Sequence, residues 1–271
     1  MALVANTTSG RTVFTASVEK KTKLTYDIVM LRVRLISPDF ISFRPGQFVQ
    51  MQIPAYEKSP TPQRRSYSIA SAPEDNSHIE LIIRRVPAGL GTTWIFDYLE
   101  EGIEIRFSGP YGKFCMQPTD NPMLWIAGGS GLSPFRAMLY DCITRKISRP
   151  IKFYYGAVSE KNLILVDELS QIAGRNGWFE FIPALSQPDA DWRGAKGLIT
   201  DVVARHIECC DRKNLEVYLC GSPGMCDAAI DVLTGHGVGM DRIFYDKFLG
   251  QDTSEIPTPD GRAISWDPQR K

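Results

Sequence analysis

The chain has 271 residues, of which 43% are hydrophobic and 23% are charged, values that are ordinary for a globular protein. Its 31 Lys and Arg balance 31 Asp and Glu, so the formal net charge is zero and neither nucleic acid nor an anionic membrane is an expected partner. At roughly 100 to 200 residues per domain, this length predicts one large domain or two of modest size.

The first part of the chain, residues 11–115, consists of short β-rich runs separated by turn signals such as Ser37-Pro38-Asp39. Evenly spaced short strands predict a small antiparallel barrel or sandwich, interrupted by one helical insert over residues 92–99. The expected strands cover residues 12–18, 28–36, 48–53, 79–86 and 103–107.

Beyond residues 110–121 the pattern changes to apolar strands that alternate with helices, which predicts a parallel sheet with right-handed crossovers over residues 120–249. The first expected helix carries one apolar stripe at helical spacing. The stripe of this helix consists of Phe135, Met138, Leu139, Cys142 and Ile143. A Pro-rich polar tail follows the parallel domain at residues 250–271. The other expected elements are strands at 123–127, 151–155, 178–182, 215–220 and 242–245 and helices at 163–172, 199–207 and 223–233.

Targeting and metal-binding signals are weak. No basic and then apolar segment opens the chain, and no run approaches the roughly 20 apolar residues of a membrane span, so we expect a soluble cytoplasmic protein. The six cysteines form no CxxC or CxxxxCxxC run, which argues against zinc and iron–sulfur sites, and without a secretory signal they are expected to be reduced. These are Cys115, Cys142, Cys209, Cys210, Cys220 and Cys226.

Two glycine-containing turns each connect an expected strand to an expected helix. In the first, Ser133 is placed as the helix N-cap and Pro134 as the first helical residue. Such turns suit a pyrophosphate because glycine lets it approach the backbone and the helix N-terminus offers N–H groups. A tight turn without a ligand remains the alternative. The residues concerned are Gly128, Gly129, Ser130 and Gly131 in the first turn, and Cys220, Gly221, Ser222, Pro223 and Met225 in the second, whose helix should turn Met225, Ala229, Val232 and Leu233 inward.

Residues 64–71 (RRSYSIAS) resemble the RxYS motif with which the ferredoxin–NADP reductase superfamily holds a flavin on a six-stranded antiparallel barrel. The resemblance is collinear over residues 11–249: residues 44–48 resemble the family's PGQF strand, residues 220–223 its CGPP turn, and residues 245–248 its closing aromatic. It implies an FAD-binding barrel followed by a Rossmann-like NAD(P)H-binding domain. Reductases of bacterial oxygenases are similar, and residues 191–197 are also similar to the flavin part of sodium-pumping quinone reductases.

The resemblance implies roles for the flavin-binding residues. Arg65 would bind a flavin phosphate, Tyr67 would stack on the ring and Ser68 would hydrogen-bond the flavin N5. The loop at residues 71–74 favours FAD over FMN. A core tyrosine flanked by solvated arginines, and a simply capped helix, are the alternatives. The flavin-binding set also includes Ser66, Ile83, Arg84, Gly89, Thr92 and Thr93.

On the nicotinamide side, the resemblance places Cys220 beside the reactive carbon and Phe248 over the flavin face, with core packing as the alternative for both. Asp246 is either a nearby polar group or an exposed strand end. Glu160, which follows Ser159, favours NADH because a carboxylate repels the 2′-phosphate of NADPH. Lys161 leaves NADPH open, and Glu160 would also suit the start of a helix.

The expected reaction is hydride transfer from NADH to FAD, followed by single-electron transfer to a separate ferredoxin, oxygenase or other redox protein. No cysteine cluster lies before Arg11 or after Phe248, so the acceptor is expected to be another chain. An electron-transfer subunit of a larger complex and a regulatory nucleotide-binding module without turnover are the other hypotheses. For the tail, we expect disorder or loose surface docking, with a lid anchored by Trp266 as the alternative.

Overall fold

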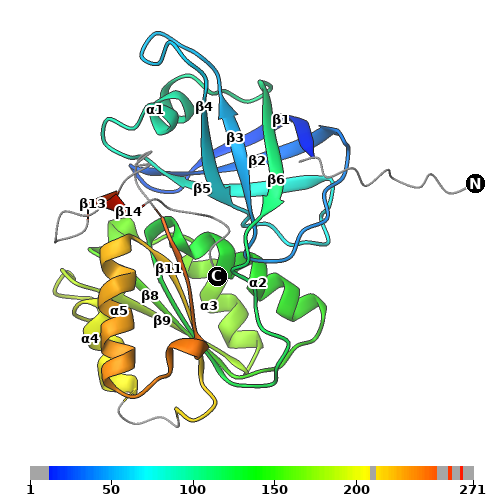
Figure 1. Cartoon of the computed structure of the whole chain (residues 1–271). Coiled ribbons are helices and arrows are strands. Elements are labelled where there is room, and N and C mark those ends of the chain that lie inside the picture. The colour runs from blue at the N-terminus through cyan, green and yellow to red at the C-terminus, as the bar shows by residue number, and fades with distance from the viewer. Residues whose placement is uncertain (1–11, 208–211, 249–255, 258–262, 265–271) are drawn as a thin grey trace, which may run out of the picture.

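Two six-stranded sheets, one antiparallel and one parallel, make up most of the protein (Figure 1). The computed structural model describes residues 12–207, 212–248, 256–257 and 263–264. The first sheet ends at Tyr111 and the second begins at Met123. Within the described residues, no helix is long and apolar enough to cross a membrane.

The first sheet has the strand order β4-β3-β6-β1-β2-β5, and every neighbouring pair is antiparallel. A bridge between Ile69 and Leu81 brings the end of β4 to β5, at the other edge of the sheet. Alternate side chains point inward, as in β1, where Phe14, Ala16 and Val18 are buried. The expected six-stranded antiparallel fold of this part of the chain is confirmed. Its elements are β1 (Val13–Lys23), β2 (Ile28–Ser37), β3 (Phe48–Ile53), β4 (Gln63–Ser68), β5 (His78–Arg84), α1 (Leu90–Asp97) and β6 (Glu104–Tyr111).

Helix α1 is tied to the sheet by Lys21 of β1. The ammonium of Lys21 donates to the carbonyl oxygens of Ile95, Phe96 and Leu99 at 2.7, 3.0 and 2.8 Å. These carbonyls lie at and just beyond the end of the helix, where no further turn provides them with N–H partners. The contact fixes α1, and therefore its N-terminus, relative to the strands.

The second sheet has the order β10-β9-β8-β7-β11-β12 and is parallel throughout, as expected. Helices α2 and α3 cover one face, and α4 and α5 cover the other (Figure 1). Its elements are β7 (Met123–Gly128), η1 (Gly129–Gly131), α2 (Leu132–Thr144), β8 (Ile151–Ala157), η2 (Glu160–Asn162), α3 (Val166–Arg175), β9 (Phe179–Leu185), β10 (Ala195–Lys196), α4 (Ile199–Ile207), β11 (Glu216–Gly221), α5 (Pro223–Gly235), η3 (Met240–Arg242) and β12 (Ile243–Lys247).

Three local predictions in this sheet were wrong. Ser133 is not an N-cap: α2 begins at Leu132 after a 3-10 turn, and the Ser133 hydroxyl donates to the Ser130 carbonyl at 2.7 Å. Ile143 is 37% exposed, because the buried stripe of α2 turns away from it. In α5, Val232 was predicted to face inward but is only partly buried, whereas Cys226, which was not predicted to face inward, is fully buried.

Parts of the tail fall outside the described residues. Among the described ones, β13 (Ile256–Pro257) pairs antiparallel with β14 (Ala263–Ile264). Trp266, Cys209 and Cys210 lie outside the described residues, so the predictions that concern them stay untested. The four described cysteines are free and buried.

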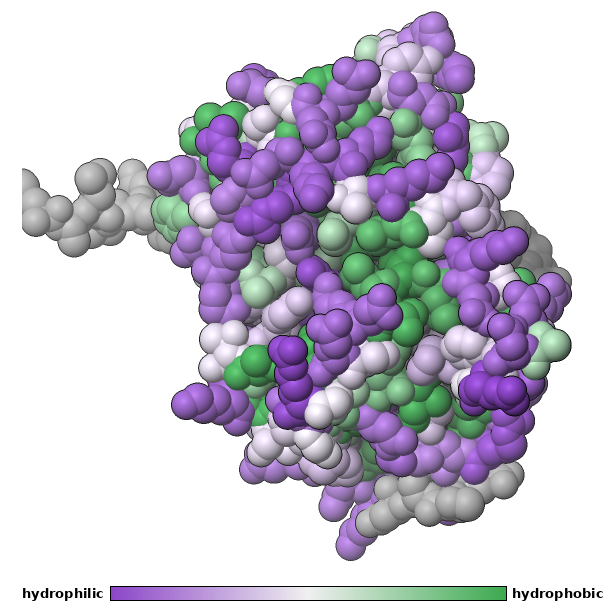
Figure 2. Space-filling model, turned by 180° about the vertical axis from the view of Figure 1, so that it is seen from behind, coloured by the Kyte–Doolittle hydropathy of each residue, from purple (hydrophilic) through white to green (hydrophobic). Residues whose placement is uncertain are grey.

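One apolar core is shared by the two sheets. Ile28, Ala70 and Ile82 from the barrel belong to the same buried cluster as Trp125 of β7 and Phe135 of α2. Figure 2 shows apolar surface gathered where the barrel meets the parallel domain. Because apolar burial supplies about 25 cal/mol per Å², this shared core resists separation of the two sheets.

A buried ion pair fixes the opposite, amino-terminal end of the parallel strands. Arg149 donates to Glu216 at 2.8 Å, and their side chains are 7% and 4% exposed. Burial alone would raise the pKa of the Glu216 carboxyl, but hydrogen bonds from Thr119, Arg149, Tyr218 and Asn121 lower it below its usual value. Arg149 also donates to the carbonyls of Gln117 and Asn121, so the segment between the sheets is held at this point.

We predict that Glu216→Gln lowers the free energy of unfolding by about 3 to 5 kcal/mol at neutral pH, because Arg149 keeps its charge without a counter-ion. The lowered pKa means that the wild-type carboxylate stabilises the fold above the ordinary glutamate range and loses this effect as pH falls. The difference between variant and wild type should therefore shrink in acid. Urea unfolding at both pH values measures it.

The control is Glu180→Gln. Glu180 pairs with Lys152 on the surface, where the side chains are 56% and 43% exposed, so its loss should cost less than about 1 kcal/mol. Equal effects of the two substitutions would contradict the prediction.

Candidate nucleotide-binding site

The motif strand β4 directs two of its predicted flavin residues to one side. Arg65 and Tyr67 are partly buried. Their neighbours on the strand, Arg64 and Ser66, point to solvent, because successive side chains of a strand alternate between its two faces. Burial raises the pKa of the Tyr67 phenol, and Arg65 opposes this shift. Ser66 therefore lies on the face away from the other two, and only its backbone remains close to them.

The first turn of α1 lies against Arg65. A Cβ added to Gly91 would fall 2.7 Å from Cγ of Arg65, so glycine permits this close approach. Since the first N–H groups of a helix have no intrahelical partners, the arginine and the helix start together form a group of donors. Arg65 also donates to the Arg64 carbonyl at 2.8 Å and to the Gln63 side chain.

The side chains of Thr92 and Ile83, both predicted to be near a flavin diphosphate, make their contacts within the barrel domain. The Thr92 hydroxyl accepts from the N–H of Val86 at 3.0 Å and lies 3.2 Å from the Gly89 carbonyl, so it holds the preceding loop together. Ile83 is 1% exposed and points into the barrel core. Gly89 is the helix N-cap, and Thr93 lies in the first turn. Only the backbone of Ile83 can line a ligand site.

Arg84 reaches across the domain boundary. Its Nε donates to Asp27 at 2.7 Å, and its Nη1 is 3.5 Å from the position of a Cβ on Gly129. The guanidinium therefore lies beside the first glycine turn of the parallel domain. The sequence motif had placed Arg84 with the flavin diphosphate, and gave no indication of Asp27 as its partner.

The two glycine turns lie side by side with Met225 between them. A Cβ on Gly128 would be 2.8 Å from the Met225 sulfur, and a Cβ on Gly221 would be 2.6 Å from its terminal methyl. A Cβ on Gly131 would be only 2.2 Å from the Cys220 carbonyl oxygen. The hydroxyl of Tyr155 supports the first turn by donating to the Gly129 carbonyl at 3.0 Å. The structure thus brings both predicted turns to one place, at the carboxyl ends of β7 and β11.

Ser68, at the end of the motif strand of the barrel, lies near Asp246 of β12 in the parallel sheet. Burial raises the pKa of the Asp246 carboxyl to about 6, and the nearby Ser68 hydroxyl opposes this rise. Cys220 is the β11 partner of Asp246 and is fully buried. Burial, Asp246 and Cys226 all raise the pKa of the Cys220 thiol, so this thiol is neutral at physiological pH.

Phe248 closes this region from the end of β12. Its N–H donates to the Gly221 carbonyl at 2.8 Å, and its partly buried ring packs with the apolar core beneath α2. The sequence left Asp246 open between a nearby polar group and an exposed strand end. The structure leaves Asp246 partly buried, near Ser68 of the barrel.

The loop after β8 carries the predicted selector of NADH. Ser159 donates its hydroxyl to the side-chain oxygen of Asn162 at 2.9 Å, and Glu160 opens the short helix η2. Glu160 is exposed and lines a surface pocket together with Leu163, Leu165 and Trp192. Glu160 can both begin the short helix η2 and select NADH over NADPH, because its side chain is exposed and is not used up by the turn.

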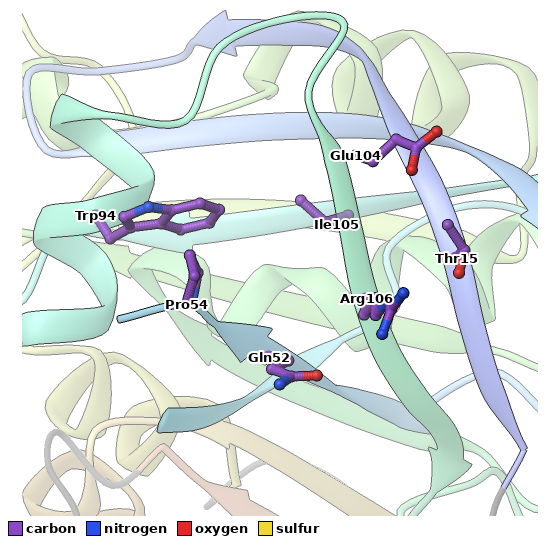
Figure 3. Close-up of a pocket in the computed structure, with 7 residues that line it drawn as sticks. All are labelled: Thr15, Gln52, Pro54, Trp94, Glu104, Ile105 and Arg106. Carbon is purple, nitrogen blue, oxygen red and sulfur yellow. The ribbon is translucent and has the colours of Figure 1, made fainter. Parts of the chain in front are cut away.

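A second pocket, of about 270 Å³, lies on the barrel at the side of α1. Figure 3 shows Trp94 above Pro54, with Arg106 and Glu104 on the neighbouring strand. None of the predicted nucleotide-binding residues lines it, so this pocket carries no part of the site.

The residues present fit a flavin nucleotide. The Tyr67 hydroxyl is buried and has no hydrogen-bond partner among the described residues, which is costly unless a ligand supplies one. Arg65 beside the α1 N-terminus provides the donors that a diphosphate requires. At Gly128 and Gly221 the place of a Cβ is taken by Met225, whereas at Gly129 the nearest group is the Arg84 guanidinium at 3.5 Å. The donor set of a nicotinamide dinucleotide site is therefore present at Gly129, where a cation lies beside a backbone turn.

Two family models divide the chain. Residues 15–116 match the oxidoreductase FAD-binding domain and residues 125–231 match the oxidoreductase NAD-binding domain. The chain is 35% identical over 238 residues to the reductase component of propane 2-monooxygenase from Mycolicibacterium goodii, covering 86% of this chain and 66% of that protein. It is 30% identical to the xylene/toluene monooxygenase electron transfer component of Pseudomonas putida, covering 87% and 65%. The chain therefore spans just under two thirds of the length of these relatives.

Solved structures agree with this division. The Amycolatopsis cytochrome P450 reductase GcoB superimposes with a TM-score of 0.79 at 28% identity, covering 88% of this chain and 70% of that one. A ferredoxin reductase in carbazole 1,9a-dioxygenase gives a TM-score of 0.76 at 29% identity, with the same coverage.

We predict that Asp246→Asn removes a pH dependence of folding. Because the folded-state pKa is raised to about 6, the folded wild type binds this proton more tightly than the unfolded chain, and its stability falls as pH rises past about 4 to 6. Asparagine has nearly the same shape as aspartate and does not ionise. The variant should be more stable than wild type by up to about 3 kcal/mol above pH 6, and equal to it near pH 4.

Urea unfolding of flavin-free protein at several pH values measures this effect. The matched control is Asp241→Asn, since Asp241 lies exposed on the same domain. Parallel stability curves for wild type and Asp246→Asn would contradict a buried carboxyl at this position.

Proposed function

The chain belongs to the ferredoxin–NADP reductase superfamily, and on that premise we propose that it oxidises NADH with bound FAD and passes single electrons to a separate redox protein. The observation that carries the proposal is that the flavin-motif side of the barrel meets the glycine turns of the parallel sheet: Arg84 of β5 lies beside Gly129. Ser68 of the motif strand likewise lies near Asp246, the β12 neighbour of Cys220. Residues 11–115 would form the flavin domain, residues 120–249 the nicotinamide domain and residues 250–271 a tail.

When bound, FAD supplies the chemistry of accepting a hydride and releasing electrons one at a time. Arg65 would bind its diphosphate together with the N–H groups at the start of α1 and Thr93, and Tyr67 would stack on the ring. Ser68 would present its hydroxyl to the flavin N5. Asp246, whose pKa is raised to about 6 by burial, would hold or release a proton close to Ser68 near neutral pH.

The paired turns would bind the nicotinamide dinucleotide. Gly129, beside Arg84, would let its pyrophosphate approach the backbone, while Gly128, Gly131 and Gly221 allow the two turns to pack closely against Met225 and the Cys220 carbonyl. Phe248 would cover the flavin face until the nicotinamide displaces it. Cys220 would lie behind the reacting carbon as a neutral, space-filling thiol that keeps water out of this region.

The electron acceptor would be another protein, a ferredoxin or an oxygenase component. Support comes from the relatives, whose names identify them as reductase or electron transfer components of monooxygenases. The same proposal places the reaction in the cytoplasm, where NADH is available. The Glu160 carboxylate supports NADH over NADPH because it would face the 2′-phosphate of the latter.

Anaerobic mixing of the purified yellow protein with NADH tests the proposal. Rapid bleaching of the flavin colour is the expected result. Unchanged colour would contradict it and favour an electron-transfer subunit with a vestigial nicotinamide site, or a regulatory module without turnover.

We predict that Arg65→Ala yields largely colourless protein, because one charged hydrogen-bond interaction worth about 1.5 to 3 kcal/mol is lost. Tyr67→Ala should also weaken flavin binding through the lost stacking surface. Flavin content per protein, measured by absorbance after gel filtration, checks both variants. Arg64→Ala is the matched control, since Arg64 lies on the same strand and points to solvent. Full retention of flavin in both Arg65→Ala and Tyr67→Ala would contradict the assignment of these two residues to flavin binding.

We predict that Glu160→Arg raises the preference for NADPH relative to NADH, by about tenfold for each 1.4 kcal/mol of changed transition-state stabilisation. The ratio of kcat/KM for the two nucleotides measures it. Asp241→Arg makes the same charge change on an exposed residue of η3 and should leave the ratio unaltered. An unchanged ratio in Glu160→Arg would place the selector elsewhere.

A further inference from the structure

A single arginine of α2 lies in the boundary between the two domains. Arg136 is 8% exposed, and its Nη1 donates to the Ala70 carbonyl at 2.9 Å and to Glu80 at 2.6 Å. Its Nε donates to one carboxylate oxygen of Glu168 at 2.7 Å, and its Nη2 to the other at 3.4 Å. Ala70 and Glu80 belong to the barrel, and Glu168 belongs to α3 of the parallel domain.

The chemistry of this contact requires a permanent, planar cation. Burial alone would lower the pKa of the Arg136 guanidinium, but Glu168 and Glu80 raise it above its usual value. Tyr140 stacks with the guanidinium at 5.0 Å and donates to Glu168 at 3.1 Å. Lysine would retain the charge but not donors in three fixed directions.

The three acceptors place Arg136 between the two halves of the nucleotide site. Ala70 lies two residues beyond Ser68, and its own N–H donates to the Glu80 carbonyl at 2.8 Å. On the other side, α2 begins directly after the first glycine turn, whose Gly131 is packed against the Cys220 carbonyl. Arg136 therefore connects the segment that carries Ser68 to the helix that carries the turn and contacts Cys220.

We propose that Arg136 is a positioning residue that sets the separation between the flavin strand and the dinucleotide-binding helix, and thereby the alignment of the two nucleotides. The inference rests on the proposed function. The shared apolar core holds the domains together without a preferred direction, whereas charge-assisted hydrogen bonds fix distances and angles. A displacement of about 1 Å between reacting groups can cost about a hundredfold in rate.

The test compares two conservative substitutions in the flavin-loaded protein. Arg136→Lys should lower the rate constant of flavin reduction by NADH at least about tenfold in stopped-flow measurements, with flavin content and the dissociation constant for NADH within about twofold of wild type. Arg149→Lys is the control: its ion pair with Glu216 is equally buried but lies at the far end of the strands. It should lower the melting temperature while leaving the reduction rate unchanged.

Hydrogen exchange of the flavin-free protein provides a readout that does not depend on turnover. Arg136→Lys should speed exchange of the Ala70 amide and of the first turn of α2, and Arg149→Lys should leave both protected. If Arg136→Lys does not fold, Glu80→Gln replaces it in both experiments. Glutamine keeps an oxygen acceptor for Arg136 without the charge, so the reduction rate and the amide protection should fall less than in Arg136→Lys.

A wild-type reduction rate in Arg136→Lys, or an equal slowing in Arg149→Lys, would overturn the inference. A wild-type protein that NADH does not reduce would overturn the proposed function instead. In that case the hydrogen exchange comparison still decides whether Arg136 fixes the domain boundary, and unchanged protection in Arg136→Lys would count against it.

Discussion

Two nucleotides can exchange a hydride only if the sheets that hold them keep a fixed separation, and Ser68 of the barrel and Asp246 of β12 lie near each other where the two sheets of this protein meet. Burying a carboxyl is costly, as its raised pKa shows. A core built for stability alone would place an apolar residue at the end of β12. The retained carboxyl is the kind of local conflict that proteins accept at functional sites.

The neighbouring features serve the same alignment at different distances. Met225 keeps the two glycine turns apart by the width of one side chain, and Tyr155 supports the first turn from below. Lys21 holds α1, whose N-terminus lies beside Arg65. Tyr155 and Lys21 thus hold, from outside the site, elements that would bind a nucleotide, whereas Met225 joins two parts of the site itself.

Strongly periodic segments could be predicted from sequence, as β3 and α4 were with their observed bounds. Strand β4 did not emerge from periodicity because its polar residues face the site and the solvent instead of the core. Ser133 was predicted as an N-cap, but a 3-10 turn precedes it, and the serine that caps its helix is Ser222. The partly buried position of Asp246 depends on the barrel residues near it, such as Ser68, which no local pattern reveals.

The core shared by Ile28, Ala70, Ile82, Trp125 and Phe135 has a consequence for dissecting the protein. Each sheet also has a core of its own, so the family models can treat the two halves as separate units. Either half expressed alone would nevertheless expose its part of the shared core and be prone to aggregate. A chimera that exchanges one half with a relative would keep its fold only if the incoming half supplied side chains of matching shape at this interface.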